Sequence, residues 1–441
     1  MKRFAGRSLS YPLTCTLSAL VLAACSTDVS PVAPVSPGVA LGRDGDPLLS
    51  VGAGAIAIVT HDNDSGKGSL REAILQANTD PAIRRIEIKP ANLTVPLAST
   101  IEYTGTQALT IIGKHAVIDA SAVDGSAILV SGGADLVIEA LTIRDAGGEG
   151  LEVQIPAAAT GTVRVVLREL SVTGNAGHGV LINDQVDQST TDGVQPNANG
   201  SAASLDVTIE DSRFANNGYS VSDRDGLRVN EGGDGDLTFT ARGAIAEDNA
   251  ADGIELDERG AGSVFIDVRD TRILRNGKFD PEDLDDGFDI DEYNDGSIVG
   301  TVTRTTANDN YEEGLDFNEN NAGDLRVDLA GVEASRNREE GIDYEEDDDF
   351  AGGGDLVTTM TDIVTNGNGV DGGDAGLKIR EKGVGNLTLV VTRVTASSNL
   401  IAGISIREDA AGSGTALLAA ATLLGNAGGA LSGNVIPTIL P

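Results

Sequence analysis

Tryptophan is absent from this chain, and the other aromatic residues are scarce. The 441 residues include only 6 Tyr and 8 Phe. Sites that bind small molecules are usually lined with aromatic and apolar side chains. The composition therefore weighs against a sugar-binding groove of the ordinary kind, for which Tyr293, Tyr311 and Tyr344 are the main candidates.

Basic residues and cysteines are also few. The chain has 31 Lys and Arg residues but 68 Asp and Glu residues, and its formal net charge is −37. A chain of this charge repels the phosphate backbone, which excludes nucleic acid as a partner. The two cysteines are Cys15 and Cys25, and Cys15 lies in a segment that we expect to be removed. We therefore predict no disulfide within the mature chain.

Apolar runs long enough to span a membrane are missing after residue 24. Residues 1–24 have the features of a signal peptide, with a basic start at Lys2 and Arg3 and then a short apolar run. The run ends in Leu-Ala-Ala-Cys at Cys25, which resembles the lipobox of bacterial lipoproteins. The resemblance implies cleavage before Cys25 and its acylation. Because Ser26 follows, it also implies an outer-membrane lipoprotein, periplasmic or surface-exposed, anchored by its lipid alone.

Two short regions are expected between the signal peptide and the main body of the chain. Residues 25–54 hold the acylated Cys and a flexible linker of Pro and small residues. Residues 55–108 are predicted to form an N-terminal cap and irregular first coils. Within them, Ser69 and Glu72 make a capping box for a short amphipathic helix. Such a helix would cover the open end of a repeat array.

A repeat with a basic period of 27 residues occupies residues 109–434, and 435–441 form a C-terminal tail. Leu237–Ser263 and Ile298–Asp324 are two of its copies. Apolar residues alternate within each copy, which indicates strands. A fixed period of this length is typical of a solenoid. We therefore predict an all-β parallel β-helix of about 11 regular coils.

The chain also resembles a known family over about Leu109 to Asn434, the right-handed parallel β-helix, or pectin-lyase-like, proteins. Ser69–Ala73 (Ser-Leu-Arg-Glu-Ala) is similar to the segment that opens many secreted bacterial members. The resemblance implies a right-handed solenoid with a short N-terminal capping helix. It leaves the activity open, because this fold carries lyases, hydrolases, adhesins and structural rods alike.

One Asn recurs at the thirteenth position of every coil from the one that starts at Val163 onward. Asn tolerates a left-handed backbone at a turn, and Asn side chains stacked about 4.8 Å apart can hydrogen-bond to one another. We predict a structural asparagine ladder, whose members include Asn217, Asn249, Asn276, Asn310, Asn337, Asn368 and Asn399.

Acidic residues concentrate in the middle of the repeat, with 38 of the 68 between Asp223 and Asp349. They keep register with a Gly that opens the second strand of each coil. The residue before this Gly, and those two, four and five after it, are acidic in most central coils. Insertions in the coils adjoin the same strand, which predicts a groove there. The row before the Gly is Asp225, Asp252, Asp286, Glu313 and Glu340.

We expect these rows on an outward face, where stacked carboxylates about 4.8 Å apart repel one another. A bound cation would offset the repulsion, and oxygen ligands at this density favour Ca²⁺. The alternative is a solvated acidic surface that keeps the chain soluble. The predicted metal ligands are Glu255, Asp257, Glu258, Asp289, Asp291, Glu292, Asp316, Glu319, Asp343, Glu345 and Glu346.

Two functions fit these features. We favour an adhesin-like or structural binding protein that holds Ca²⁺ and contacts a polysaccharide or a basic protein, directly or through the ion. The alternative is a calcium-dependent polysaccharide lyase or other carbohydrate-active enzyme, in which a basic residue abstracts a proton. Arg228, Lys378, Arg380 and Arg407 are candidates, although salt bridges to the acidic rows are their more ordinary role. We interpret His178 as a turn residue.

Overall fold

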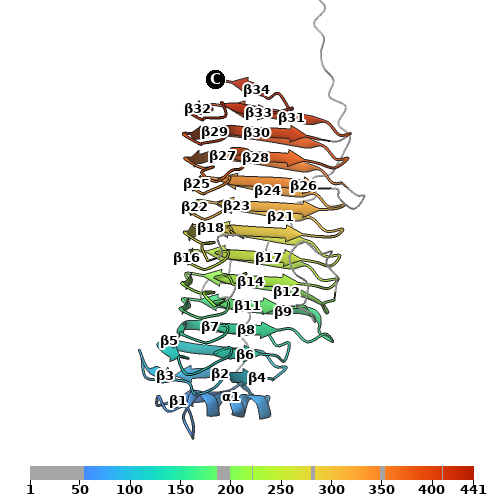
Figure 1. Ribbon diagram of the computed structural model, residues 1–441. Coiled ribbons are helices and arrows are strands. Elements are labelled where there is room, and N and C mark those ends of the chain that lie inside the picture. Colours follow the sequence, from blue (N-terminus) through green and yellow to red (C-terminus); the bar gives the residue numbers. More distant parts are fainter. Residues whose placement is uncertain (1–53, 186–198, 221, 280–283, 348–352, 410) are drawn as a thin grey trace, which may run out of the picture. The chain divides into compact units, whose positions relative to one another are not determined.

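The computed structural model describes residues 54–185, 199–220, 222–279, 284–347, 353–409 and 411–441. Over these residues the chain winds through about 13 turns of a parallel β-helix, and successive coils stack on one another (Figure 1). The predicted fold class is confirmed. The turns outnumber the 11 predicted coils because the irregular N-terminal coils complete turns as well.

Some predictions fall outside the described residues. The signal peptide, Cys25 and the linker up to residue 53 all lie there. In the part of the chain that the structure does describe, no helix is both long and apolar enough to cross a membrane.

The strands form two sheets. Among the described residues, sheet A has 22 strands and sheet B has 12. Sheet A consists of β1 (Ala55–Val59), β2 (Ile83–Ile88), β3 (Thr94–Pro96), β5 (Leu109–Asp119), β7 (Leu136–Arg144), β9 (Thr160–Arg168), β10 (Ser171–Thr173), β12 (Ala202–Glu210), β13 (Arg213–Ala215), β15 (Leu237–Arg242), β16 (Ile245–Glu247), β18 (Val264–Arg269), β19 (Arg272–Leu274), β21 (Ile298–Thr303), β22 (Thr306–Asn308), β24 (Leu325–Ala330), β25 (Glu333–Ser335), β27 (Leu356–Asn366), β29 (Leu387–Ser397), β31 (Gly414–Ala419), β32 (Thr422–Leu424) and β34 (Thr438–Leu440). Sheet B consists of β4 (Ile101–Tyr103), β6 (Ile128–Val130), β8 (Leu151–Gln154), β11 (Val180–Asn183), β14 (Leu227–Glu231), β17 (Ile254–Glu258), β20 (Phe288–Glu292), β23 (Leu315–Asn320), β26 (Ile342–Asp347), β28 (Ala375–Glu381), β30 (Ala402–Glu408) and β33 (Leu431–Gly433).

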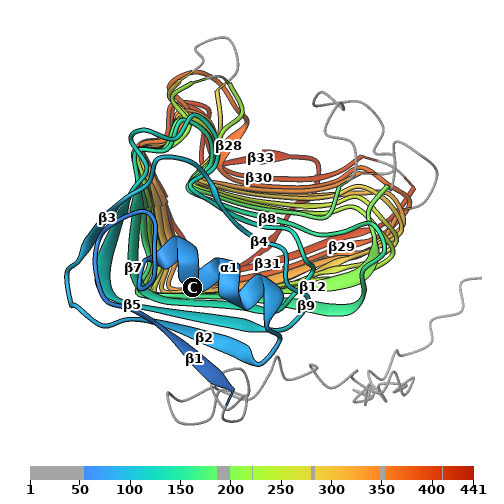
Figure 2. The same ribbon diagram turned by 90° about the horizontal axis from the view of Figure 1, so that it is seen from below.

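Each regular coil follows the same path. It runs along sheet A, bends, continues in sheet A, turns at the recurring Asn and enters sheet B. Seen end-on, sheet A makes two sides of the coil and sheet B closes the third (Figure 2). The coil that starts at Leu237 passes through β15, β16 and β17 in this order.

The predicted stacking register holds along most of the β-helix. Leu237 pairs with Val264, and Ile298 pairs with Leu325, as the 27-residue period requires. One step differs, because Leu136 pairs with Val165 rather than with Val163. A shift of two residues keeps every side chain on its original face of the sheet, so the core tolerates it.

Alternate side chains of sheet B fill the core, as the pattern predicts. Ile254 and Leu256 on β17 are 1% and 0% exposed. An aromatic column runs through neighbouring coils, with ring centroids 6.3 Å apart for Phe288 and Phe317 and 4.7 Å apart for Phe317 and Tyr344. Tyr344 is therefore a core residue, and the interpretation of it as a groove aromatic is wrong.

The N-terminal end of the β-helix is covered by α1 (Leu70–Thr79) (Figure 2). Ser69 is its N-cap and accepts a hydrogen bond from the Glu72 N–H, as the capping box predicts. Leu70 and Ile74 on the inner face of α1 are buried, so this helix closes the apolar core at the first coils.

The recurring asparagines stack in a column. Each side-chain amide donates to the side-chain oxygen of the next Asn along the helix axis, from Asn175 to Asn426, at 3.0 to 3.4 Å. The same oxygen also accepts the backbone N–H of the preceding Asn, as Asn310 does from Asn276 at 3.1 Å. An amide is suited to this position because it donates and accepts at once.

The left-handed backbone at this turn lies one residue earlier than expected. Asp248, Arg275 and Asp309, each directly before a ladder Asn, have φ of 57°, 60° and 62°. Stacked ion pairs hold these residues, since the Arg275 guanidinium contacts both Asp248 oxygens. The ladder Asn is thus selected for its amide and not for its backbone.

Replacing Asn310 with Ala should lower the free energy of unfolding by about 2–4 kcal/mol, because it leaves buried donors of Asn276 without an acceptor. Urea unfolding would measure the change. Asn386→Ala is the control, since Asn386 is exposed and its loss should change stability by about 0.5 kcal/mol or less. Equal effects of the two substitutions would contradict a stabilising ladder.

Candidate metal centre

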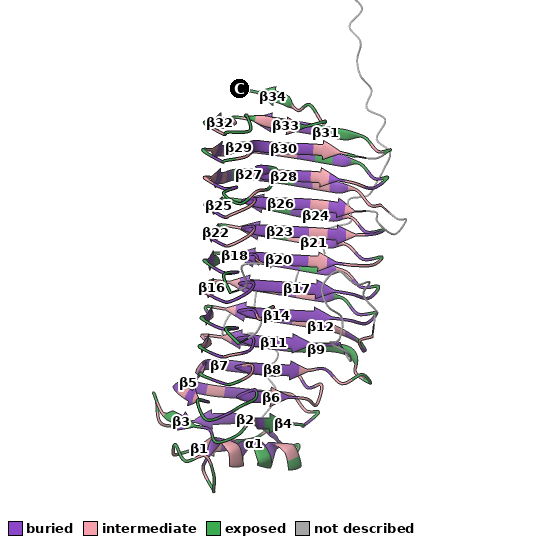
Figure 3. Cartoon of the chain, viewed as in Figure 1, coloured by how far each residue is buried: buried purple, intermediate pink, exposed green. Residues whose placement is uncertain are grey.

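The acidic rows of sheet B lie beside one another in register. Glu255 on β17 pairs with Asp289 on β20, and Asp289 pairs with Asp316 on β23. Although these side chains alternate with the core residues, many are buried; Glu255 is 6% exposed. Figure 3 shows β14 and β17 buried along their whole length. The carboxylates are therefore removed from the water that would otherwise screen them.

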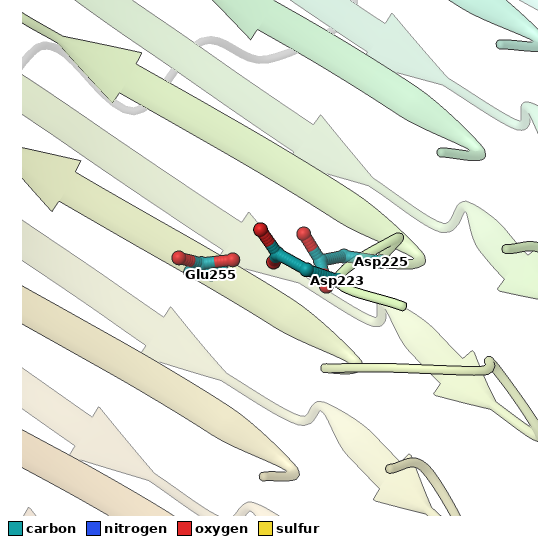
Figure 4. A group of neighbouring side chains, drawn as sticks. All are labelled: Asp223, Asp225 and Glu255. Atoms are coloured by element: carbon teal, nitrogen blue, oxygen red, sulfur yellow. The ribbon is translucent and has the colours of Figure 1, made fainter. Parts of the chain in front are cut away.

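At one end of these rows a guanidinium sits among the carboxylates. Asp223, Asp225 and Glu255 converge there (Figure 4). Arg228 reaches Asp223 Oδ1 and Glu255 Oε1 at 2.6 Å each, and Asp257 Oδ2 at 2.9 Å. Burial alone would lower the Arg228 pKa, but its carboxylate neighbours raise it well above its usual value. The guanidinium of Arg228 therefore already neutralises the group formed by Asp223, Asp225 and Glu255.

At the other end, lysines have the same role. Lys378 Nζ lies 2.6 Å from both Asp343 Oδ2 and Glu345 Oε1, and Lys382 contacts Glu345 and Asp347. Burial acts to lower the Lys378 pKa, but Asp343 and Glu345 outweigh it and raise it. Lys378 is therefore held protonated, which opposes a role as proton-abstracting base.

Between these ends, no ion pair joins Asp252, Asp286, Asp289 or Asp316 to a basic residue among the described residues, while Glu255 keeps its contact with Arg228. Two groups, each with oxygens within 4.8 Å of one another, share Asp289: Asp252 with Glu255 and Asp289, and Asp286 with Asp289 and Asp316. A third group joins Asp286 to Glu312 and Glu313. Oxygens this close can share one Ca²⁺, whose ligands lie about 2.3–2.6 Å from the ion.

The backbone fixes two of the central carboxylates, Asp252 and Asp286, and leaves oxygens of the others available. Asp252 Oδ1 accepts the Asp286 N–H at 2.5 Å, and Asp286 Oδ1 accepts the Glu313 N–H at 2.6 Å. In contrast, Glu255 Oε2, Asp289 Oδ1 and Asp316 Oδ1 are buried without a hydrogen bond. Buried oxygens without a donor are costly, and a cation would supply what they lack.

The electrostatics of the centre agree with this geometry. Burial, followed by the nearby carboxylates, raises the pKa of Asp289 and Asp252 well above the usual range. The same causes raise the pKa of Asp291 to about 6 and that of Asp316 to about 7. In the absence of a cation, Asp252 and Asp289 therefore retain protons at neutral pH, and Asp316 retains one in part.

Several predicted ligands lie outside these groups. Asp257 contacts Arg228 and Arg259, Asp291 accepts a hydrogen bond from Tyr293, and Glu345 pairs with Lys378. The structure thus unites Glu255, Asp289 and Asp316 of the predicted set with Asp252, Asp286 and Glu313, which were not among the predicted ligands. The signal for the added residues was the acidic row that precedes the coil Gly.

The glutamates five residues after the Gly do not lie on the outward face. Glu258, Glu292, Glu319 and Glu346 are each 0% exposed. Expecting them beside the other rows was wrong, because a strand alternates its side chains and Glu258 has the same parity as Ile254 and Leu256. They form a separate internal row.

The remaining candidates are held by local contacts. Arg380 contacts Glu345 and Asp409, and Arg407 contacts Asp374 and Asp409. His178 lies in the turn before β11 and is 3% exposed, and its Nδ1 accepts the Asp225 N–H at 3.0 Å. Each residue supports the arrangement of neighbouring coils.

Comparison with known proteins agrees with the fold. A family model described as the right handed beta helix region matches residues 86–269. The chain is a right-handed parallel β-helix. A search of curated proteins finds no match to the sequence.

Three solved structures illustrate how distant the similar proteins are. Pectate lyase Pel9A is 18% identical, with a TM-score of 0.48 over 72% of this chain and 78% of that one. The periplasmic alginate epimerase AlgG is 14% identical, with a TM-score of 0.42 over 85% and 89%. The A-module of Azotobacter vinelandii mannuronan C-5 epimerase AlgE4 is 11% identical, with a TM-score of 0.44 over 87% and 98%. Likeness at this level carries no argument about activity.

Replacing Asp316 with Asn should stabilise the metal-free protein at pH 8 by at least about 1 kcal/mol. Since the pKa of Asp316 is raised to about 7, the folded state keeps a proton that the unfolded state releases, and stability falls as pH rises from about 4 to about 7. Chemical unfolding with a chelator at several pH values would test this.

The matched control is Asp234→Asn, because Asp234 is exposed. Its curve of stability against pH should follow that of the unmodified protein. An Asp316→Asn protein with an unchanged slope would contradict the role of Asp316.

Proposed function

We propose that this chain is a lipid-anchored binding protein of the bacterial outer membrane, adhesin-like or structural, whose sheet B binds Ca²⁺. The observation that carries the proposal is the pair of carboxylate groups that share Asp289. They combine buried oxygens without donors with a position between Arg228 and Lys378, which neutralise the two ends of the rows.

The chemistry of the groups favours Ca²⁺ over softer metals. All ligands at the centre are carboxylate oxygens, and hard oxygen ligands suit Ca²⁺, which takes six to eight of them. The five carboxylates of the two groups carry more negative charge than one divalent ion neutralises, and binding should strengthen with pH as the ligands lose protons. Through this ion, or beside it, the face would contact a polysaccharide or a basic protein.

Calorimetric titration of residues 26–441 with Ca²⁺ should show saturable binding, and thermal melts should show a higher Tm in Ca²⁺ than in EDTA, because the ion binds only the folded state. Asp289→Asn should weaken Ca²⁺ binding at least tenfold, because Asp289 belongs to both carboxylate groups and its replacement removes a charged ligand from each. Mg²⁺ should bind more weakly, because it requires a smaller octahedral site.

Asp234→Asn serves as the control and should bind Ca²⁺ like the unmodified protein. If the unmodified protein shows neither saturable heat nor a Tm shift, the acidic rows do not bind Ca²⁺ and form only a solvated acidic surface. The proposal would then fail.

The anchor is tested separately in a Gram-negative host. The full-length chain should incorporate labelled palmitate and fractionate with the outer membrane, and Cys25→Ala should abolish both, because the resemblance places the acyl chains on Cys25. Cys15→Ala is the control and should leave both unchanged. Labelling that persists in Cys25→Ala would contradict the assignment.

A further inference from the structure

A second column of ionisable groups runs along the β-helix, inside sheet B and apart from the metal centre. We call it the glutamate ladder. Each member ends the inward-facing row of its strand, beside core residues such as Leu256. Its members are Glu231, Glu258, Glu292, Glu319, Glu346, Glu381 and Glu408.

The ladder is sealed from solvent. All members except Glu408 are 0% exposed. Behind them the turns of successive coils pack so closely that only Gly fits. A Cβ at Gly323 would lie 1.3 Å from the Gly296 carbonyl oxygen. The recurrent Gly four residues after most ladder glutamates thus allows the backbone to close over the carboxyl groups.

One carboxyl oxygen of each central member accepts a backbone N–H. Glu258 Oε1 accepts from Gly260 and Glu319 Oε1 from Gly323, each at 2.9 Å, and Glu292 Oε1 accepts from Asn294 at 3.1 Å. The other oxygen of these three side chains is buried, and no backbone or side-chain N–H among the described residues reaches it.

No positive charge faces the ladder in the described part of the chain. The groups that act on it are its own neighbouring members and, at the Glu231 end, Asp184. The adjacent basic residues point elsewhere: Arg259 contacts Asp257, and Lys382 contacts Glu345 and Asp347. A buried row of ionised carboxylates about 4.8 Å apart is therefore electrostatically untenable.

We propose that the glutamate ladder is a proton-binding column, in which alternate members are carboxylic acids that donate their O–H to the ionised carboxylate of a neighbouring coil. The arrangement pairs the unbonded oxygens of Glu258, Glu292 and Glu319 with the ladder members that they face. The glutamate ladder resembles the asparagine ladder, which lies at the opposite end of the sheet B strands. A proton shared between carboxyl groups takes the place of the amide hydrogen.

The titration of the ladder supports this alternation. Burial, and then hydrogen bonds with Glu292 and Glu231, raise the pKa of Glu258 to about 11. Burial and ladder neighbours raise the pKa of Glu319 and of Glu381 to about 10 each. In Glu292, burial raises the pKa while the hydrogen bond from Glu258 lowers it, which marks Glu292 as an acceptor.

The ladder makes the stability of the coils depend on pH in a defined direction. An unfolded Glu loses its proton near pH 4.5, whereas Glu319 and Glu381 of the ladder keep theirs to about pH 10. Stability due to these groups is thus complete below pH 4.5 and falls as pH rises toward 10. Each retained proton changes the unfolding constant by about tenfold per pH unit in that window.

Infrared spectroscopy of the wild-type protein in EDTA at pH 7 tests the proposal directly. We expect a carbonyl band from protonated carboxylic acids that disappears in alkali together with the folded structure. Saturating Ca²⁺ should leave the ladder part of this band in place, whereas acids at the metal centre would lose their protons. No acid band remaining in Ca²⁺ would overturn the proton column and leave the proposed metal site unaffected.

A triple substitution of Glu258, Glu319 and Glu381 by Gln supplies the second test, because an amide donates as a carboxylic acid does but does not titrate. In EDTA the variant should have a higher Tm than wild type at pH 9, a flatter Tm between pH 6 and 9, and a weaker acid band. The exposed Glu102→Gln should behave as wild type. Single Glu319→Gln gives the same readouts if the triple variant does not fold. A lower Tm at pH 9 for Glu319→Gln would overturn the proposal.

Discussion

Repulsion between like charges at strand spacing is the constraint on which the rest of this structure depends. A parallel β-helix places equivalent residues of successive coils about 4.8 Å apart, so any acidic residue kept in register becomes a row of charges. Burial then removes the water that would screen them. Sheet B carries several such rows, and the surrounding contacts can be understood as ways to neutralise them.

The negative charge of the acidic rows is neutralised in three different ways along sheet B. At the ends, Arg228 and Lys378 place fixed cations between carboxylates. At the centre, Asp252, Asp286, Asp289 and Asp316 converge without a basic partner among the described residues, which is the arrangement an added ion would complete. Inside the sheet, where Glu258, Glu292 and Glu319 are fully buried, we propose that protons take this role. The position of an Asp or Glu in the coil thus decides whether a basic side chain, an added ion or a proton neutralises it.

The two ladders show the same principle with different chemistry. An asparagine side chain both donates and accepts, so Asn249 and Asn276 can repeat along the axis without any change of charge state. A carboxylate only accepts, so the glutamate column repeats only if some members carry protons. The binding interpretation agrees with the basic residues near the acidic face, because Lys378, Arg380 and Arg407 already have ion-pair partners.

Period and alternation in the sequence were sufficient to determine the parallel β-helix, its stacking register apart from the Leu136 step, and the asparagine column, since these follow from local repeats. The capping helix followed from the capping box at Ser69 and Glu72. Period and alternation also placed Glu255, Asp289 and Asp316 in one row. Which carboxylates meet, and which are already neutralised, was decided only by the tertiary structure. Arg228 and Lys378 lie in the same row, beside Glu255 and Asp343, but periodicity does not tell how many carboxylates each contacts. It also does not show that Asp252 and Asp286, which precede the coil Gly, come close to Asp289. The inward position of Glu258 was available from its parity with Leu256, but its burial depends on how closely the glycine turns of neighbouring coils pack.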